Sequence, residues 1–447
     1  MTNKRHESLI LALLAYVAFD LLAHWHPGLR GSFEFLPREN GGDVNEFVTL
    51  WLAEFSRNVR ELGFRATFYW VNPWSVGGFY TSHPGGLTFL TAVWQNLFGE
   101  APDTLRRLAI LFFAVRLGLF HSLVARAYGF AAARVAFFFY LLVPTTQTYT
   151  HALSFEVISG TLVLAAFWAR AWWARALLMA SAGLVDWTAL LALPVFLWFS
   201  PRRFASLWLI AVPLCSQFYW SRATGGGGEQ LSRLYMYLVG PYHVLRENPE
   251  AVAMLWRAVL LSFPIPVLLF FFFDLFRHGV RKREPWFYAA ILAGGAFLVM
   301  FLGVFRVHPY ASQLLILPLC AAAGRGFLEL FPSKKLRALV LVPLILSSLW
   351  WSAYPFQSRE NAETRVTLRQ EAEKIAALLA GSRYSIHGDL RFLRPEPLPL
   401  YLGAFGARER KDGCAKFTVH YRSVMESHPE AQFIGNFLLL TENDCAR

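Results

Sequence analysis

The sequence predicts an all-α polytopic membrane protein with a small α+β domain at its C-terminal end. Of its 447 residues, 55% are hydrophobic and only 16% are charged, a composition too apolar for a soluble domain of this length. Several apolar stretches approach or reach the length that spans a bilayer, among them Ser8–Trp25, Ala251–Phe276 and Leu336–Trp351. The formal net charge of +12 fits Lys and Arg gathered in cytoplasmic loops. Because no soluble basic domain is present, we expect no nucleic-acid partner.

Hydropathy and loop charge predict about eleven transmembrane helices in a domain covering residues 1–352, with a cytoplasmic N-terminus and an external C-terminal end. The stretch 176–200 is expected to hold two short helices that turn near Asp186, because both of its flanks are basic and must share one side. The expected helices lie at about 8–25, 104–125, 131–148, 155–171, the pair within 176–200, 204–220, 251–276, 286–305, 311–324 and 336–352.

Two loops and a tail are expected outside the cytoplasm. The first loop, 26–103, contains the apolar stretch Gly85–Phe98, which is too short for a comfortable span and suits an amphipathic juxtamembrane helix lying on the bilayer. The loop 221–250 contains four consecutive glycines and Arg222, and is either a mobile flap over a donor site or a plain connector.

The tail, residues 353–447, is expected to be a small extracytoplasmic α+β domain. One helical face is formed by Leu368, Ala372, Ile375 and Leu379, and strands are expected at Phe417–Tyr421 and Phe433–Leu440. If the tail lies outside the cytoplasm, Cys414 and Cys445 can form a disulfide; the alternative is two unrelated thiols.

Two acids follow the first apolar segment closely. In the run Asn40-Gly41-Gly42-Asp43-Val44-Asn45-Glu46 the carboxylates of Asp43 and Glu46 are three residues apart, so a helix would place both on one face. Acids close to a bilayer are costly, which makes them candidates for chemistry. The alternative is a solvated helix start, with Asn40 or Asp43 as the cap.

A second motif follows in the same external region. It runs from Tyr80 through His83-Pro84-Gly85 to Phe98-Gly99-Glu100. Pro84 can start a helix and Gly99 can end one. His83 would then lie at a helix N-terminus, where phosphate can also bind; the alternative is an amphipathic surface helix with a chance His.

These motifs carry a resemblance to a known family. An acid soon after the first helix, then YTSHPGGLTFLTAVWQNLFGE, then LRRLAILFFAVRLGLFHSLVARAYGFAAARVAFFFYLLVP, resembles the GT-C glycosyltransferases. More narrowly, the chain resembles the bacterial branch of the protein O-mannosyltransferase and aminoarabinose-transferase-like superfamily. The resemblance covers residues 40–200 well and reaches 290–325 weakly. The chain departs from it in having Pro84-Gly85 where Pro-Pro is usual, and in separating Asp43 from Glu46.

The resemblance implies an inverting transfer from a polyprenyl-phosphate-linked sugar donor to an acceptor hydroxyl at the outer face of the cytoplasmic membrane. Asp43 matches the catalytic acid of the family's first loop. In such a transfer a carboxylate deprotonates the acceptor and stabilises positive character at the anomeric carbon. Glu46 and His83 would support it. The acceptor implied is a glycolipid, a polysaccharide or a protein.

Further site residues are expected at two other external turns. Glu156 either orients the acceptor or His83, or belongs to the cap of the fourth helix together with Ser154. Arg306, His308 and Tyr310 lie at the outer end of the ninth helix, where the resemblance implies a contact to the donor phosphate; the alternative is an interfacial anchor. Arg222 is a further candidate for the phosphate.

The sequence shows no convincing metal cluster, although a divalent ion at Asp43, Glu46 and His83 is conceivable. Two other functions stay open. A lipid-linked sugar flippase or other transporter would need polar side chains across the middle of several helices, and most ionisable residues within the expected helices lie near their ends, with Asp20 and Arg116 the main exceptions. The other is a polysaccharide ligase or polymerase that uses a diphosphate-linked donor.

Overall fold

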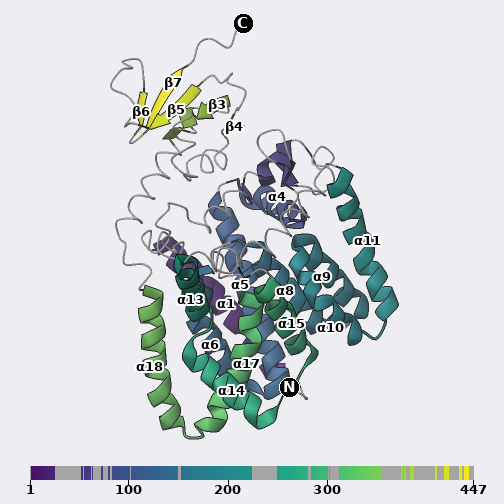
Figure 1. The fold of residues 1–447 in the computed structure, drawn as a ribbon, viewed down its shortest axis with the longest axis vertical. Helices are drawn as coiled ribbons and strands as arrows, with labels where there is room; N and C mark the ends of the chain where they lie inside the picture. Colours follow the sequence, from purple (N-terminus) through teal and green to yellow (C-terminus); the bar gives the residue numbers. More distant parts are fainter. Residues whose placement is uncertain are drawn as a thin grey trace.

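The protein is seen in a computed structural model that describes part of the chain. The described residues are 2–25, 52–53, 55–61, 63, 72–73, 79–80, 83–100, 102–149, 153–223, 249–279, 283–300, 302, 312–353, 374–375, 377–378, 383–386, 408–409, 417–421, 432–434 and 437–441. Within them the chain is mainly helical, with a small sheet lying apart from the helices (Figure 1).

The helices follow the apolar stretches of the sequence. They are α1 (Thr2–Trp25), α4 (Gly86–Phe98), α5 (Pro102–Tyr128), α6 (Phe130–Leu142), α7 (Pro144–Tyr149), α8 (Phe155–Trp168), α9 (Trp172–Val185), the 3-10 helix η1 (Trp187–Ala192), α10 (Leu193–Trp198), α11 (Arg203–Ala223), α13 (Pro249–Ser262), α14 (Ile265–His278), α15 (Pro285–Met300), α17 (Gln313–Leu330) and α18 (Lys334–Ala353). The count of eleven spans stays a prediction.

Prolines interrupt two of the expected helices. The expected helix 131–148 ends as α6 at Leu142 and restarts as α7 at Pro144. The expected helix 251–276 is wrong as a single helix, because it divides into α13 and α14 around Pro264, whose backbone is extended with ψ of 132°. A proline disfavours helical geometry in the residue before it and cannot donate an amide hydrogen, which favours a helix break at these two positions, although α11, α17 and α18 continue through Pro213, Pro318 and Pro343.

The turn predicted near Asp186 is confirmed. Helix α9 ends at Val185, and the side chain of Asp186 accepts a hydrogen bond from the backbone N–H of Thr188 at 3.0 Å, which caps η1. The chain then continues through η1 into α10. Asp186 is only 2% exposed, so this turn lies inside the protein.

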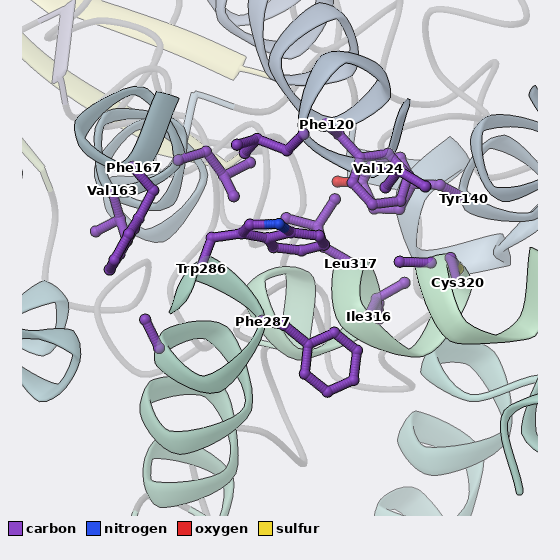
Figure 2. Close-up of a cluster of buried hydrophobic side chains, with 14 of the residues drawn as sticks. Phe120, Val124, Tyr140, Val163, Phe167, Trp286, Phe287, Ile316, Leu317 and Cys320 are labelled. Carbon is purple, nitrogen blue, oxygen red and sulfur yellow. The ribbon is translucent and has the colours of Figure 1, made fainter. Parts of the chain in front are cut away.

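Aromatic side chains fill the centre of the helical bundle (Figure 2). The indole of Trp286, at the start of α15, lies edge-on to Phe120 of α5 with 6.2 Å between ring centroids. The ring of Phe120 in turn packs against the ring of Tyr140 of α6, with 5.6 Å between their centroids. These contacts join α15 to the consecutive helices α5 and α6, which lie far earlier in the sequence, and so help to fix how the three helices pack.

A smaller hydrophobic cluster joins the helical residues at 52–53 to α4, α5 and α8. Helical residues at 52–53, 55–61 and 63 bring Leu52 and Ala53 against Leu87 of α4 and Leu105 of α5. The helix expected from Gly85–Phe98 is confirmed as α4, and Gly99 ends it with a φ of 104°, which glycine adopts readily. Before α4 in the sequence, two short strands that were not expected, β1 (Asn72–Pro73) and β2 (Phe79–Tyr80), pair antiparallel with each other.

A mixed sheet of five strands lies near the C-terminal end (Figure 1). The strands are β3 (Arg383–Ile386), β4 (Arg408–Glu409), β5 (Phe417–Tyr421), β6 (Gln432–Ile434) and β7 (Phe437–Thr441), in the order β4-β3-β5-β7-β6. Strand β5 covers the residues expected. The other expected strand, 433–440, is two strands, because β6 and β7 pair antiparallel with Ile434 opposite Phe437. In the sequence they are separated by Gly-Asn, a dipeptide typical of two-residue hairpin loops.

The outer faces of several helices carry large apolar side chains. The exposed fraction is 92% for Phe276 of α14, 82% for Phe204 of α11 and 69% for Leu339 of α18. Among the described helices, α5 from Thr104 to Tyr128 and α17 are long and apolar enough to cross a membrane, with mean hydropathies of 2.0 and 1.3.

Candidate functional site

The candidate site is organised by the N-terminus of α8. Ser154 is its N-cap, and the hydroxyl oxygen accepts a hydrogen bond from the backbone N–H of Val157 at 3.2 Å. Glu156 lies in the first turn, where the helix dipole favours a negative charge. Of the two interpretations of Glu156, the structure shows the arrangement of the second, with Ser154 as the cap and Glu156 in the first turn. The carboxyl group of Glu156 also interacts with the side chain of Ser154 and with its own backbone N–H.

The segment just before α4 brings His83 to this turn. The imidazole of His83 stacks on the ring of Phe155, with 4.0 Å between centroids and 15° between planes. This approach depends on Gly86, because a Cβ atom added there would lie 2.5 Å from the backbone oxygen of Leu184 in α9. The stacking brings His83 to the first turn of α8, where Glu156 is the next residue after Phe155.

Glu156 also borders a small cavity between four elements. The cavity has a volume of about 20 Å³, which is room for a water molecule and not for a sugar. Its lining comes from α8 (Glu156, Ser159, Gly160, Val163), η1 (Thr188, Ala189), α15 (Ala293, Gly294, Phe297) and α17 (Leu314). Most of this lining is apolar, with Ser159 and Thr188 as the polar side chains beside Glu156.

A second acid, which was not expected there, lies in the neighbourhood of Glu156, since Thr188, which binds it, lines the same cavity as Glu156. Asp186 interacts electrostatically with the Glu156 carboxyl group, and both of its oxygens also bind Thr188, one at the backbone N–H and the other at the hydroxyl. Sequence reasoning gave Asp186 no role beyond a turn. The signal that could have found it is an acid within an otherwise apolar stretch, which is costly unless it is used.

The structure does not bring every predicted site residue to this place. Arg222, in the last turn of α11, is exposed and is not among the residues that line the cavity. Asp43, Glu46, Arg306, His308 and Tyr310 lie outside the described residues, as do Cys414 and Cys445 of the predicted disulfide.

The described residues contain no cluster of side chains that could bind a metal ion. In the described part of the chain, no three His, Cys, Asp or Glu side chains gather closely enough to hold an ion. The divalent ion considered for Asp43, Glu46 and His83 remains untested, because two of those three residues are not described.

Comparison with known proteins gives a structural match only. No family model matches the chain, and no curated protein matches it. A crystal structure of ArnT from Cupriavidus metallidurans bound to undecaprenyl phosphate superposes with a TM-score of 0.57 at 14% identity, covering 96% of this chain and 97% of that one. The apo state of the same protein gives a TM-score of 0.51 at 15% identity, covering 88% and 74%. The chain therefore has a GT-C-like fold, similar over almost its whole length to that of ArnT.

Proposed function

We propose that the chain is an integral membrane glycosyltransferase of the inner, cytoplasmic membrane. It would move a sugar from a polyprenyl-phosphate donor to an acceptor hydroxyl on the outer face, with inversion at the anomeric carbon. The observation that carries the proposal is the shared fold with ArnT, a protein crystallised with undecaprenyl phosphate. Because a fold alone does not fix an activity, the residues of the site must support the same reading.

The surface of the molecule supports the membrane location. Soluble proteins bury most of their large apolar side chains, and extended apolar surface marks a contact with lipid or another protein. Here Trp198, Trp208 and Phe276 are 73%, 70% and 92% exposed. They lie on three different helices, α10, α11 and α14. A lipid environment would cover all three, whereas a single protein partner would cover one face.

The proposed chemistry uses one proton transfer and one bond exchange. Asp43 would take the proton of the acceptor hydroxyl as its oxygen attacks the anomeric carbon. The bond from that carbon to the phosphate oxygen breaks, and its electron pair leaves with the phosphate. Arg306 with His308, Tyr310 and Arg222 would stabilise the charge on the departing phosphate, because positioned cations act strongly in a water-poor site.

We propose that His83 and Glu156 assist Asp43, and the following contacts support this. His83 stacks on Phe155 at 4.0 Å, and Glu156 is the next residue on α8. This pair would flank the reaction centre, with Glu46 beside Asp43. The tail 353–447 would then choose the acceptor, which we propose to be a glycolipid, a polysaccharide or a protein.

The test is transfer from a labelled polyprenyl-phosphate sugar by the purified protein. We expect Asp43→Asn to lower kcat by at least about 100-fold, since general base catalysis contributes on the order of 10²–10⁴. Glu284→Gln is the matched control, because Glu284 forms an ion pair with Arg126 at 3.3 Å in the loop before α15 and has no place in the proposed site. Full activity of the Asp43→Asn protein would remove Asp43 from the mechanism.

Two other results would point to a different function. Movement of labelled lipid-linked sugar across proteoliposomes without any transfer would favour a transporter. Transfer from a diphosphate-linked donor, with no competition by the monophosphate-linked one, would favour a ligase or polymerase.

A further inference from the structure

Arg116 of α5 is the most deeply buried cation in the described bundle, with 0% of its surface exposed. Its guanidinium joins three other helices. Nε donates to the hydroxyl of Thr161 on α8 at 3.1 Å, and Nη1 donates to the hydroxyl of Tyr140 on α6 and to the side-chain oxygen of Gln313 on α17, each at 3.3 Å. Tyr140 in turn donates to the same Gln313 oxygen at 2.5 Å.

The remaining guanidinium nitrogen binds the backbone that carries Glu156. Nη2 donates to the carbonyl oxygen of Glu156 at 3.3 Å and to that of Val157 at 2.6 Å. Both carbonyls belong to the first turn of α8, so Arg116 holds this turn from the side of α5. Fixing this main chain sets the positions of the Cα and Cβ atoms of Glu156, from which its carboxyl group extends.

The charge of Arg116 is costly where it lies. The partners of its guanidinium within the described chain are hydroxyl, amide and backbone oxygens, which are dipoles and not carboxylates. Burying a charge without a counter-ion costs several kcal/mol, and an apolar side chain of similar size usually packs as well or better. Helix packing alone would therefore be served by Met or Leu at this position.

Helix α8 is adapted to receive the guanidinium. A Cβ atom added to Gly160 would lie 2.6 Å from Nη2 of Arg116, so any other residue at 160 would push the guanidinium away from the two carbonyls. Glycine inside a helix costs about 1 kcal/mol relative to Ala. A buried charge and a glycine inside a helix each destabilise the bundle, and together they allow the contact between the Arg116 guanidinium and the first turn of α8.

We propose that Arg116 is a positioning residue for the transfer reaction. It fixes the first turn of α8 so that the carboxyl group of Glu156 is held in the orientation the reaction needs. Arg116 does not touch the substrate, and it acts through Glu156. This inference rests on the proposed function, since it concerns the rate of that transfer.

The test compares kcat and KM of Arg116→Gln and Gly160→Ala with those of the unsubstituted protein. Both variants weaken the bonds to the two carbonyls, the first by removing the guanidinium and the second by displacing it. We expect kcat to fall about 100-fold for Arg116→Gln, since a misplaced catalytic group can cost that much, with KM for the lipid donor changed less than about 3-fold. Gly160→Ala should lower kcat less, because the charge stays.

Two controls separate positioning from folding. Gly295→Ala adds the same methyl group to a helical glycine that has nothing within 4 Å of the new Cβ, and Arg107→Gln removes an exposed arginine from the same helix α5; both should leave kcat unchanged. Hydrogen exchange gives a second measurement that needs no activity. The amides of Gly160 and Thr161, which bond to the carbonyls of Glu156 and Val157 in a regular helix, should exchange faster in Arg116→Gln.

Each result decides the matter. An unchanged kcat in folded Arg116→Gln, or in Gly160→Ala if the first variant does not fold, overturns the positioning role and leaves the proposed function intact. Loss of folded protein with normal kcat per folded molecule would also overturn it, because that shows a packing role only. Absence of transfer by the unsubstituted protein would overturn the proposed function, and the positioning role with it.

Discussion

Asp186 combines two roles that a single substitution can separate. Its carboxylate caps η1 through the backbone N–H of Thr188 at 3.0 Å, and its charge acts on Glu156 across the site. Asn serves as an N-cap as well as Asp does, whereas Ala does not. The cap therefore needs an oxygen, and the interaction with Glu156 needs the charge.

We expect Asp186→Ala to lower the free energy of unfolding by about 1 kcal/mol, the usual cost of a lost cap, and Asp186→Asn to change it by less than half of that. The measurement is denaturant unfolding in detergent micelles. Equal loss of stability in both variants would show that the charge, and not the cap, holds the turn.

At the level of elements, a buried ion network ties α14 to α17 and to the loop before α15. Asp274 of α14 is 0% exposed, accepts a hydrogen bond from Arg325 of α17 at 2.5 Å and forms an ion pair with Arg283 at 2.7 Å. The guanidinium of Arg325 also lies over the ring of Tyr128 at the end of α5, 4.6 Å from its centroid. One carboxylate therefore balances two cations where three helices meet.

Removing that carboxylate leaves two arginines without their counter-ion. We expect Asp274→Ala to lower the free energy of unfolding by about 3–5 kcal/mol, the range for breaking a buried pair. Glu284→Ala, which breaks the more exposed pair with Arg126, should cost below about 1 kcal/mol. Thermal unfolding of both variants in the same detergent measures the difference. A similar small effect for both would mean that water reaches Asp274.

The whole molecule carries its apolar surface on the outside of the bundle and its β-sheet apart from it (Figure 1). Side chains such as Phe204 and Leu339, which are 82% and 69% exposed, would be shielded from water by a bilayer. In the sequence of β5 the apolar Phe417, Val419 and Tyr421 alternate with polar residues, a pattern that suits a sheet with one face in water. This contrast supports a membrane domain followed by a water-exposed tail.

The predicted orientation can be tested with reporters fused to the chain. Alkaline phosphatase placed after Arg447 should be active, since it folds only outside the cytoplasm, and green fluorescent protein at the same place should be dark. A fusion after Pro332, in the short turn between α17 and α18, should give the opposite pattern because its neighbours Lys334, Lys335 and Arg337 are expected inside. The same pattern at both sites would show that the chain does not cross the membrane between them, so the predicted span at 336–352 would be wrong.

Sequence reasoning succeeded where local chemistry decides the outcome. The cap at Ser154, the turn at Asp186, the end of α4 at Gly99 and strand β5 all depend on neighbouring residues, and each is found where it was expected. It failed at Pro264, where a long apolar stretch hid a helix break. Hydropathy averages over a span, and a proline changes one backbone position without making the span less apolar.

What the sequence determined by itself is therefore the helical class, the positions of most helix ends, and the residue types available for chemistry near the bilayer. What only the tertiary structure decided is which of those residues meet. The stacking of His83 on Phe155, the approach of Asp186 to Glu156 and the five hydrogen bonds of Arg116 join segments separated by up to 197 positions. Local propensity cannot predict such contacts, because they depend on the close packing of helices whose apolar faces look alike in the sequence.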